Sequence, residues 1–173
     1  KYCFLLATIA TIGSCTTSEK DKLTYFGGKI IHPKSDFVLL FKNDKLVDSL
    51  FLDKDDKFII SYKNFTKGFY YFIHGNENQY VYIEPKDSIS IRLNTWDFDE
   101  SLVFSGLGAD KNNILIDCFL ENEKERYNHN TYSFYRLGPN LFKAKLDSLL
   151  NLRQKKIDDF KARQTEELPE DYS

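Results

Sequence analysis

Ser88-Ile89-Ser90-Ile91-Arg92-Leu93 carries the clearest structural signal of this chain, because polar and apolar residues alternate strictly along it. Successive side chains of a β-strand point to opposite faces, so the pattern predicts a strand with one buried and one solvated face. Further strand-like runs, separated by short polar turns, lie at 29–32, 37–42, 46–52, 58–62, 68–75 and 79–84. This spacing predicts an antiparallel β-sandwich or a partly open barrel, with lipocalin-like closure as a further alternative.

Composition agrees with a mainly β domain. The chain has 15 Phe, 11 Tyr and one Trp among 173 residues, and aromatic residues suit a half-buried pleated surface. The formal net charge is −2, with acidic and basic residues interspersed. We therefore expect no nucleic-acid partner, since such proteins carry a concentrated basic surface.

After Gly106 the apolar spacing becomes helical, which makes the predicted class α+β, mainly β, with two C-terminal helices. The first helix has Asp110 as its predicted N-cap and an apolar side formed by Ile114, Leu115, Cys118 and Phe119. The second begins at Pro139, a residue that suits the first helical position. This second helix has apolar residues along one side, and that stripe is expected to pack on the sheet or the first helix, or else on a partner helix or a following domain. The stripe consists of Phe142, Leu146, Leu149, Arg153, Ile157 and Phe160.

The first residues predict the location of the protein. An apolar run at 2–12 is followed by Ile12-Gly13-Ser14-Cys15, the form of a bacterial lipoprotein cleavage and acylation site. The run is too short for a membrane-spanning helix, which needs about 20 residues. We expect a signal peptide at 1–14, lipid attachment at Cys15 and membrane association through that anchor. The predicted location is the cell envelope, as a periplasmic or outer-membrane lipoprotein.

Behind the signal peptide we expect three regions: a flexible tether at 15–24, an antiparallel β domain at 25–108, and a helical extension or linker at 109–173. The small and charged residues after Cys15 have no apolar period and favour the tether. The remaining length is enough for one domain with its own core.

No catalytic signature stands out, and we expect no cofactor, no metal and no catalytic residue within this chain. Cys118 has no C-x-x-C partner and is expected to be a small core residue. The acidic group Asp53, Asp55 and Asp56 is expected to be a solvated turn. The group Asp97, Asp99 and Glu100 could place two carboxylates on one face of an extended segment, but glycosidase pairs normally come from separate strands. Two further patterns are a Gly106-x-Gly108 turn before a helix, and three well-separated histidines without metal-ligand spacing, His32, His74 and His129.

Aromatic residues supply the remaining candidate site. Tyr70, Phe72, Tyr80 and Tyr82 lie in two strand-like runs, and on an exposed face they could stack on sugar rings or on a partner. The other interpretation places one face of these runs in the core and the other under a loop or helix.

The chain also resembles a known family. The resemblance covers Lys29 to Asn113 and includes Gly-Phe-Tyr-Tyr-Phe (68–72), Tyr-Ile-Glu-Pro-Lys-Asp-Ser-Ile (82–89), Phe-Asp-Glu-Ser-Leu-Val-Phe-Ser-Gly (98–106) and Gly-Ala-Asp-Lys-Asn-Asn (108–113). It is similar to the N-terminal region of Bacteroidetes lipoproteins that carry a DUF4369-like β domain, a helical linker and, in many members, a TlpA-type thioredoxin domain. These motifs are structural and carry no catalytic residue.

Two functional hypotheses follow. In the first, which the resemblance suggests, the chain is the membrane-proximal, non-catalytic part of a longer envelope protein. Its β domain is then a spacer or interaction module that serves a protein partner or a downstream thioredoxin-like domain. In the second, it is a surface lipoprotein that binds glycan or another ligand through its aromatic face.

Overall fold

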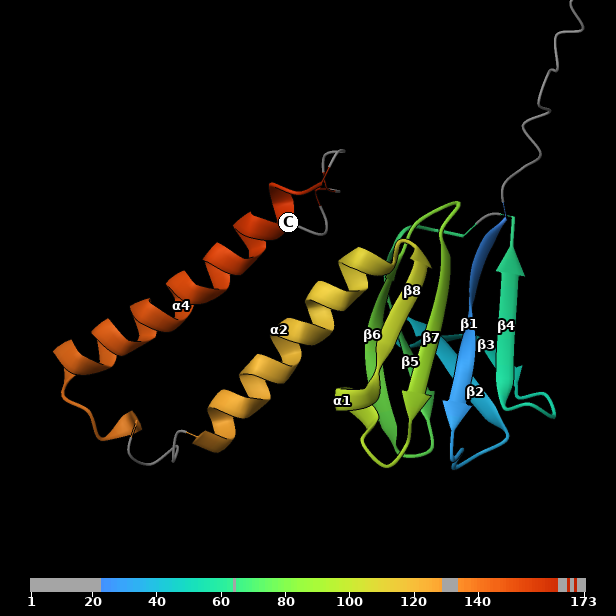
Figure 1. The fold of residues 1–173 in the computed structure, drawn as a ribbon, viewed down its shortest axis with the longest axis horizontal. Helices are drawn as coiled ribbons and strands as arrows, with labels where there is room; N and C mark the ends of the chain where they lie inside the picture. The colour runs from blue at the N-terminus through green and yellow to red at the C-terminus, as the bar shows by residue number, and fades with distance from the viewer. Residues whose placement is uncertain (1–22, 64, 129–133, 165–167, 169, 171–173) are drawn as a thin grey trace, which may run out of the picture.

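The computed structural model describes residues 23–63, 65–128, 134–164, 168 and 170. Two four-stranded sheets are followed by helices (Figure 1). The strands are β1 (Thr24–Ile31), β2 (Phe37–Lys42), β3 (Lys45–Phe51), β4 (Lys57–Tyr62), β5 (Gly68–His74), β6 (Glu77–Ile83), β7 (Ser88–Asn94) and β8 (Val103–Leu107). The helices are α1 (Phe98–Ser101), α2 (Ala109–Asn128) and α4 (Pro139–Lys161).

The strand order is β4-β1-β7-β8 in one sheet and β3-β2-β5-β6 in the other. Every pairing is antiparallel except one: β1 and β7 run parallel, from Tyr25 opposite Ser88 to Ile31 opposite Asn94. The predicted antiparallel sandwich is confirmed, and this pair is its one departure from antiparallel pairing among the described strands. The physical reason is that β1 and β7 are separated by the whole second sheet, so no hairpin sets their direction.

The core lies between the two sheets, and the fold is a β-sandwich with C-terminal helices. Phe26 of β1 contacts Phe58 within its own sheet and Phe72 across the interface, with ring centroids 5.7 and 5.9 Å apart. The predicted alternation of β7 is confirmed, because Ile89, Ile91 and Leu93 are buried. Their polar neighbours in β7 are exposed.

Helix α2 closes one side of the sandwich through two adjacent asparagines. Asn112 accepts a hydrogen bond from the Tyr82 backbone N–H (2.6 Å) and donates one to the Tyr82 carbonyl (2.9 Å). Asn113 does the same with the N–H and carbonyl of Phe104, both at 3.0 Å. Since β6 and β8 are edge strands of different sheets, the two amides occupy backbone positions that a further strand would otherwise fill.

The turn before β7 docks on the start of α2. Gly108 has φ +91°, and a Cβ there would lie 2.5 Å from the Asp87 carboxyl carbon. Asp87 itself accepts a hydrogen bond from the Glu84 backbone N–H (2.8 Å), and Glu84 forms an ion pair with Lys111. The motifs at 82–89 and 108–113 therefore form one contact between the sandwich and the helix.

The predicted apolar side of α2 is only partly correct. Ile116 is the buried residue that faces the core, together with Ala109, whereas Ile114, Leu115 and Cys118 are half-buried and Phe119 is exposed. Asp110 lies in the first turn of the helix, which begins at Ala109.

Helix α4 begins at Pro139 as expected. It lies alongside α2 (Figure 1), where Arg153 pairs with Glu125 and Lys156 with Glu121, both at 2.6 Å. Phe160 of its stripe is buried, while Leu146 is exposed.

The structure bears on the predicted regions only in part. The signal peptide at 1–14, Cys15 and the tether up to residue 22 lie outside the described residues. Strand β1 already includes Thr24, the last residue assigned to the tether. Among the helices that the structure describes, none combines the length and apolar character of a membrane-spanning segment.

Candidate functional site

The predicted aromatic face does not form. Tyr70 is 4% exposed, Phe72 and Tyr82 are 0% exposed, and only Tyr80 reaches the surface at 58%. Tyr70 and Phe72 lie on the inner face of β5, in the core. Tyr82 points outward but is covered by the start of α2, with the Lys111 ammonium 5.6 Å from its ring centroid. The alternative interpretation, with one face in the core and the other under a helix, describes these residues.

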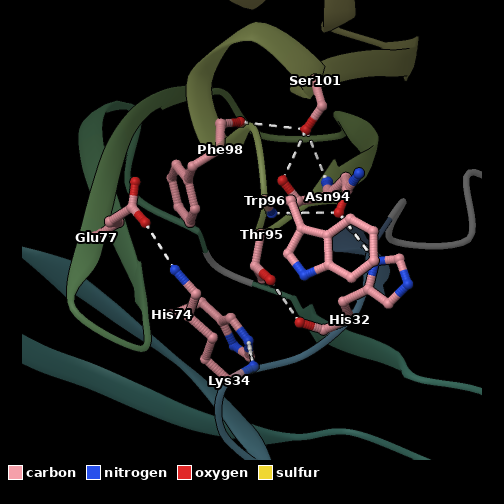
Figure 2. Close-up of polar contacts among 9 residues, drawn as sticks. All are labelled: His32, Lys34, His74, Glu77, Asn94, Thr95, Trp96, Phe98 and Ser101. Carbon is pink, nitrogen blue, oxygen red and sulfur yellow. Dashed lines mark hydrogen bonds and ion pairs between the residues drawn. The ribbon is translucent and has the colours of Figure 1, made fainter.

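An exposed aromatic pair lies instead at one end of the sandwich, where β1 and β7 both end. The indole of Trp96 is 72% exposed and stacks on the imidazole of His32, with centroids 3.7 Å apart and planes within 4° (Figure 2). We call this pair the Trp96 platform. One face of the indole is covered by His32, and the residue remains largely open to solvent.

Hydrogen bonds order the turns that carry the platform. The Thr95 hydroxyl donates to the His32 carbonyl (2.5 Å), and the Asn94 side-chain oxygen lies 3.2 Å from Nδ1 of His32. Ser101 of α1 in turn bonds both the N–H and the carbonyl of Asn94, at 2.8 and 3.0 Å (Figure 2). The Trp96 side chain is thus presented on loops whose backbone is already ordered, which lowers the entropy lost on binding.

The loop after His32 is fixed by a buried histidine. Nε2 of His74 accepts a hydrogen bond from the Lys34 backbone N–H (2.9 Å), so Nδ1 carries the proton and donates it to the Phe37 carbonyl (3.0 Å). Burial lowers the pKa of His74, which keeps this neutral form at physiological pH. The Lys34 side chain also contributes, because its ammonium group pairs with the Glu77 carboxylate at 3.1 Å. His74 therefore has a structural role, distinct from that of His32.

A second aromatic strip, half-buried except at Tyr80, crosses the outer face of the β3-β2-β5-β6 sheet. Phe41 and Tyr71 are opposite one another and stack at 5.0 Å, and Tyr80 is the next residue across the sheet, 6.0 Å from Tyr71. Leu46 extends the row on β3. Of the four aromatic residues that the sequence singled out, only Tyr80 belongs to this strip.

The acidic candidates separate into two structural roles. Asp53 accepts hydrogen bonds from the backbone N–H groups of Asp55 (2.8 Å) and Lys57 (3.0 Å), which confirms a turn and lowers the pKa of Asp53. Asp99 and Glu100 lie in helix α1, so the extended geometry considered for that segment is wrong. Asp99 accepts a hydrogen bond from the Gln79 side chain (3.0 Å), and burial raises its pKa.

The remaining candidates have structural explanations or lie elsewhere. Gly106 and Gly108 both have positive φ and lead into α2, and the Asp87 carboxylate lies against Gly108, where a phosphate would have to approach. Burial raises the pKa of Cys118, which opposes thiolate formation. Within the described part of the chain, no group of three His, Cys, Asp or Glu side chains could hold a metal ion. His129 lies outside the described residues.

Sequence reasoning missed the platform because its two residues are 64 positions apart. The available signal was the presence of one Trp in a polar turn, Asn94-Thr95-Trp96-Asp97, directly after the strongest strand. A large aromatic residue in such a turn has no strand face to pack against. Its partner could be found only once β1 and β7 were known to be parallel neighbours.

Comparisons with known proteins find a partial structural match. No family model matches the chain, and no curated protein matches it. One solved structure that matches part of the chain is a DUF3823 family protein from Bacteroides ovatus, at 14% identity and a TM-score of 0.32. The match covers 41% of this chain and 42% of that chain, so it spans less than half of either. The resemblance to DUF4369-like and TlpA-type lipoproteins stays a prediction.

Proposed function

We propose that this chain is the non-catalytic β module of a lipid-anchored bacterial envelope protein, and that it acts as an interaction module. The observation that carries the proposal is the Trp96 platform, an exposed tryptophan that stacks on His32 and is presented by a hydrogen-bonded turn. Tryptophan is enriched among the residues that dominate binding energy, since it offers a large contact area with few rotatable bonds.

The position of the platform supports this role. Strand β1 starts, and helix α4 ends, toward the same end of the molecule, whereas β1 and β7 lead to the platform at the other end (Figure 1). A tether before β1 would therefore leave the platform facing away from the membrane. Tethering also raises the local concentration of the module for a partner on the same surface.

The anchor is tested by mass analysis of the protein made in its native bacterium. The expected product lacks residues 1–14 and carries a diacylglyceryl thioether on Cys15, and Cys15→Ser removes the adduct. Retention of residues 1–14 without a lipid adduct would refute the anchor.

The proposed association with a thiol–disulfide oxidoreductase domain is tested by the gene sequence after Ser173. A C-x-x-C motif in a thioredoxin-like pattern is expected there, and a stop codon would exclude the association.

The alternative function is ligand binding, including glycan binding, through an aromatic face. It is favoured by the strip of Phe41, Tyr71 and Tyr80, because sugar rings stack on aromatic side chains and Tyr80 is exposed while the other two are half-buried. Glycan-array binding of the Tyr80→Ala and Trp96→Ala variants, each compared with the wild-type chain, distinguishes the aromatic strip from the Trp96 platform as the binding surface. Loss with Tyr80→Ala alone supports the strip, loss with Trp96→Ala alone supports the platform, and unchanged binding in both refutes an aromatic glycan site.

A further inference from the structure

The outer face of the β4-β1-β7-β8 sheet contains a trough of about 730 Å³. Its floor is made of small residues, because Gly27 of β1 is opposite Ser90 of β7, and Ser90 is opposite Ser105 of β8. Ser88 adds another hydroxyl, and Tyr25 lines the trough beside it. Tyr25 and Lys29 flank this floor along β1, and the exposed side chains of Ile59 and Phe51 also line the trough.

Three cations form a row across the trough. Lys29 of β1 lies opposite Lys57 of β4 on one side and Arg92 of β7 on the other, and all three line the trough. Like charges directly opposite one another destabilise a sheet, so this row has an electrostatic cost. None of the three forms an ion pair with another residue that the structure describes. Among the described lining residues, Asp53 is the only carboxylate, and its Oδ1 already accepts two backbone N–H groups.

We propose that this trough binds an acidic polysaccharide, with the Lys57-Lys29-Arg92 row holding its carboxylates and the serine floor bonding its hydroxyls. The site goes beyond the proposed function and depends neither on the lipid anchor nor on the Trp96 platform. Charge complementarity identifies the occupant as an anion. The trough is open, whereas sites for small molecules bury most of the ligand surface, so a chain that crosses the sheet suits it better.

Other anionic polymers fit less well. An extended peptide that adds a strand needs a sheet edge, but β1 and β7 are interior strands whose backbone groups are already paired, and side-chain recognition of an acidic peptide would leave the serine floor unused. Nucleic acid requires a more extensive basic surface than three cations on a chain of net charge −2. A polysaccharide matches both the carboxylate-binding row and the side-chain hydroxyls.

The test is calorimetric titration of the full chain with oligogalacturonate, a linear uronic acid oligomer, and with a neutral oligosaccharide of equal length. Binding to the uronate alone is expected, weakening as salt concentration rises. Lys29→Gln and Arg92→Gln should each weaken it about tenfold, since each removes one charge-assisted contact. Lys45→Gln, an exposed lysine on β3 of the other sheet, is the matched control and should change the Kd less than about twofold.

Ser90→Tyr tests the trough itself, because Ser90 is exposed and the larger ring would occupy the floor without entering the core. Loss of uronate binding, with an unchanged thermal unfolding midpoint, supports the site. Three results would overturn the proposal: no uronate binding by the wild-type chain, unchanged binding by Ser90→Tyr, or equally tight binding of polyglutamate or single-stranded DNA. Trp96→Ala should leave this binding unchanged, so failure of this site and failure of the platform can be told apart.

Discussion

Replacing Asn112 with alanine is expected to destabilise the protein more than any other single polar-to-alanine change in α2. The side chain is 0% exposed and makes three hydrogen bonds, two with the Tyr82 backbone and one, at 3.0 Å, to the Gly108 carbonyl. Alanine leaves the N–H and carbonyl of an edge strand without partners in a site that water does not reach.

The magnitude follows from those two orphaned groups. A buried polar group that loses its partner costs about 1–3 kcal/mol, so the two groups together should lower the free energy of unfolding of Asn112→Ala by about 2–6 kcal/mol. Asn113→Ala is the matched control. Its two bonds to Phe104 have the same geometry, but the side chain is only half-buried, so water can replace them and the expected loss is about 1–2 kcal/mol.

The assay is urea denaturation of the full chain, followed by far-ultraviolet circular dichroism. Asn112→Asp adds a second test, because the carboxylate keeps an acceptor for the Tyr82 N–H but has no donor for the Tyr82 carbonyl. It should be at least as unstable as Asn112→Ala at neutral pH. The reasoning fails if Asn112→Ala costs less than about 1 kcal/mol, or no more than Asn113→Ala.

Four further outcomes are expected. Gly108→Ala should cost about 2–4 kcal/mol in denaturant melts, because it combines a positive φ with a clash against Asp87. Gly138→Ala meets nothing within 4 Å and loses only the N-cap preference of glycine at the start of α4, so it should cost less than about 1 kcal/mol. Burial raises the pKa of Asp87 from 3.8 to about 7, so between these pH values the folded state binds more protons than the unfolded state. The free energy of unfolding should therefore fall by about 2–4 kcal/mol as pH rises across this window. In Asp87→Asn this pH dependence should disappear, and a pH dependence equal to that of the wild-type chain would contradict the assignment to Asp87. His74 has a pKa lowered from 6.5, so its contribution has the opposite sign: stability should be lost as pH falls below 6.5, and His74→Gln should reduce that loss in the same titration. Trp96→Ala should change the free energy of unfolding by less than about 1 kcal/mol, because the indole is mostly exposed, and a larger loss would show a structural role.

Much of the candidate surface was beyond sequence reasoning, and β5 and β6 show why. A period of two establishes that Tyr70 and Phe72 share one face, as do Tyr80 and Tyr82. It does not establish which face is inward when both are apolar, as in Phe69-Tyr70-Tyr71-Phe72-Ile73. The choice depends on what covers each face: the opposite sheet covers Tyr70 and Phe72, and α2 covers Tyr82 but not Tyr80.

The basic row and the trough show the same limit. Lys29, Lys57 and Arg92 are far apart in the chain, and each is an ordinary polar residue of an alternating strand. Only the register of three neighbouring strands places them side by side.

The sequence by itself determined the local structure: the alternation in Ser88 to Leu93 specified a half-buried strand, the short polar turns specified a mainly β domain, and Pro139 marked the start of a helix. These are effects of neighbouring residues, and propensity and periodicity are sufficient to predict them. The tertiary structure alone decided the parallel pairing of β1 and β7, the stacking of His32 on Trp96, and the use of Asn112 and Asn113 to join two sheet edges. Each of these joins segments at least nine residues apart, and local sequence does not encode the direction in which such segments meet.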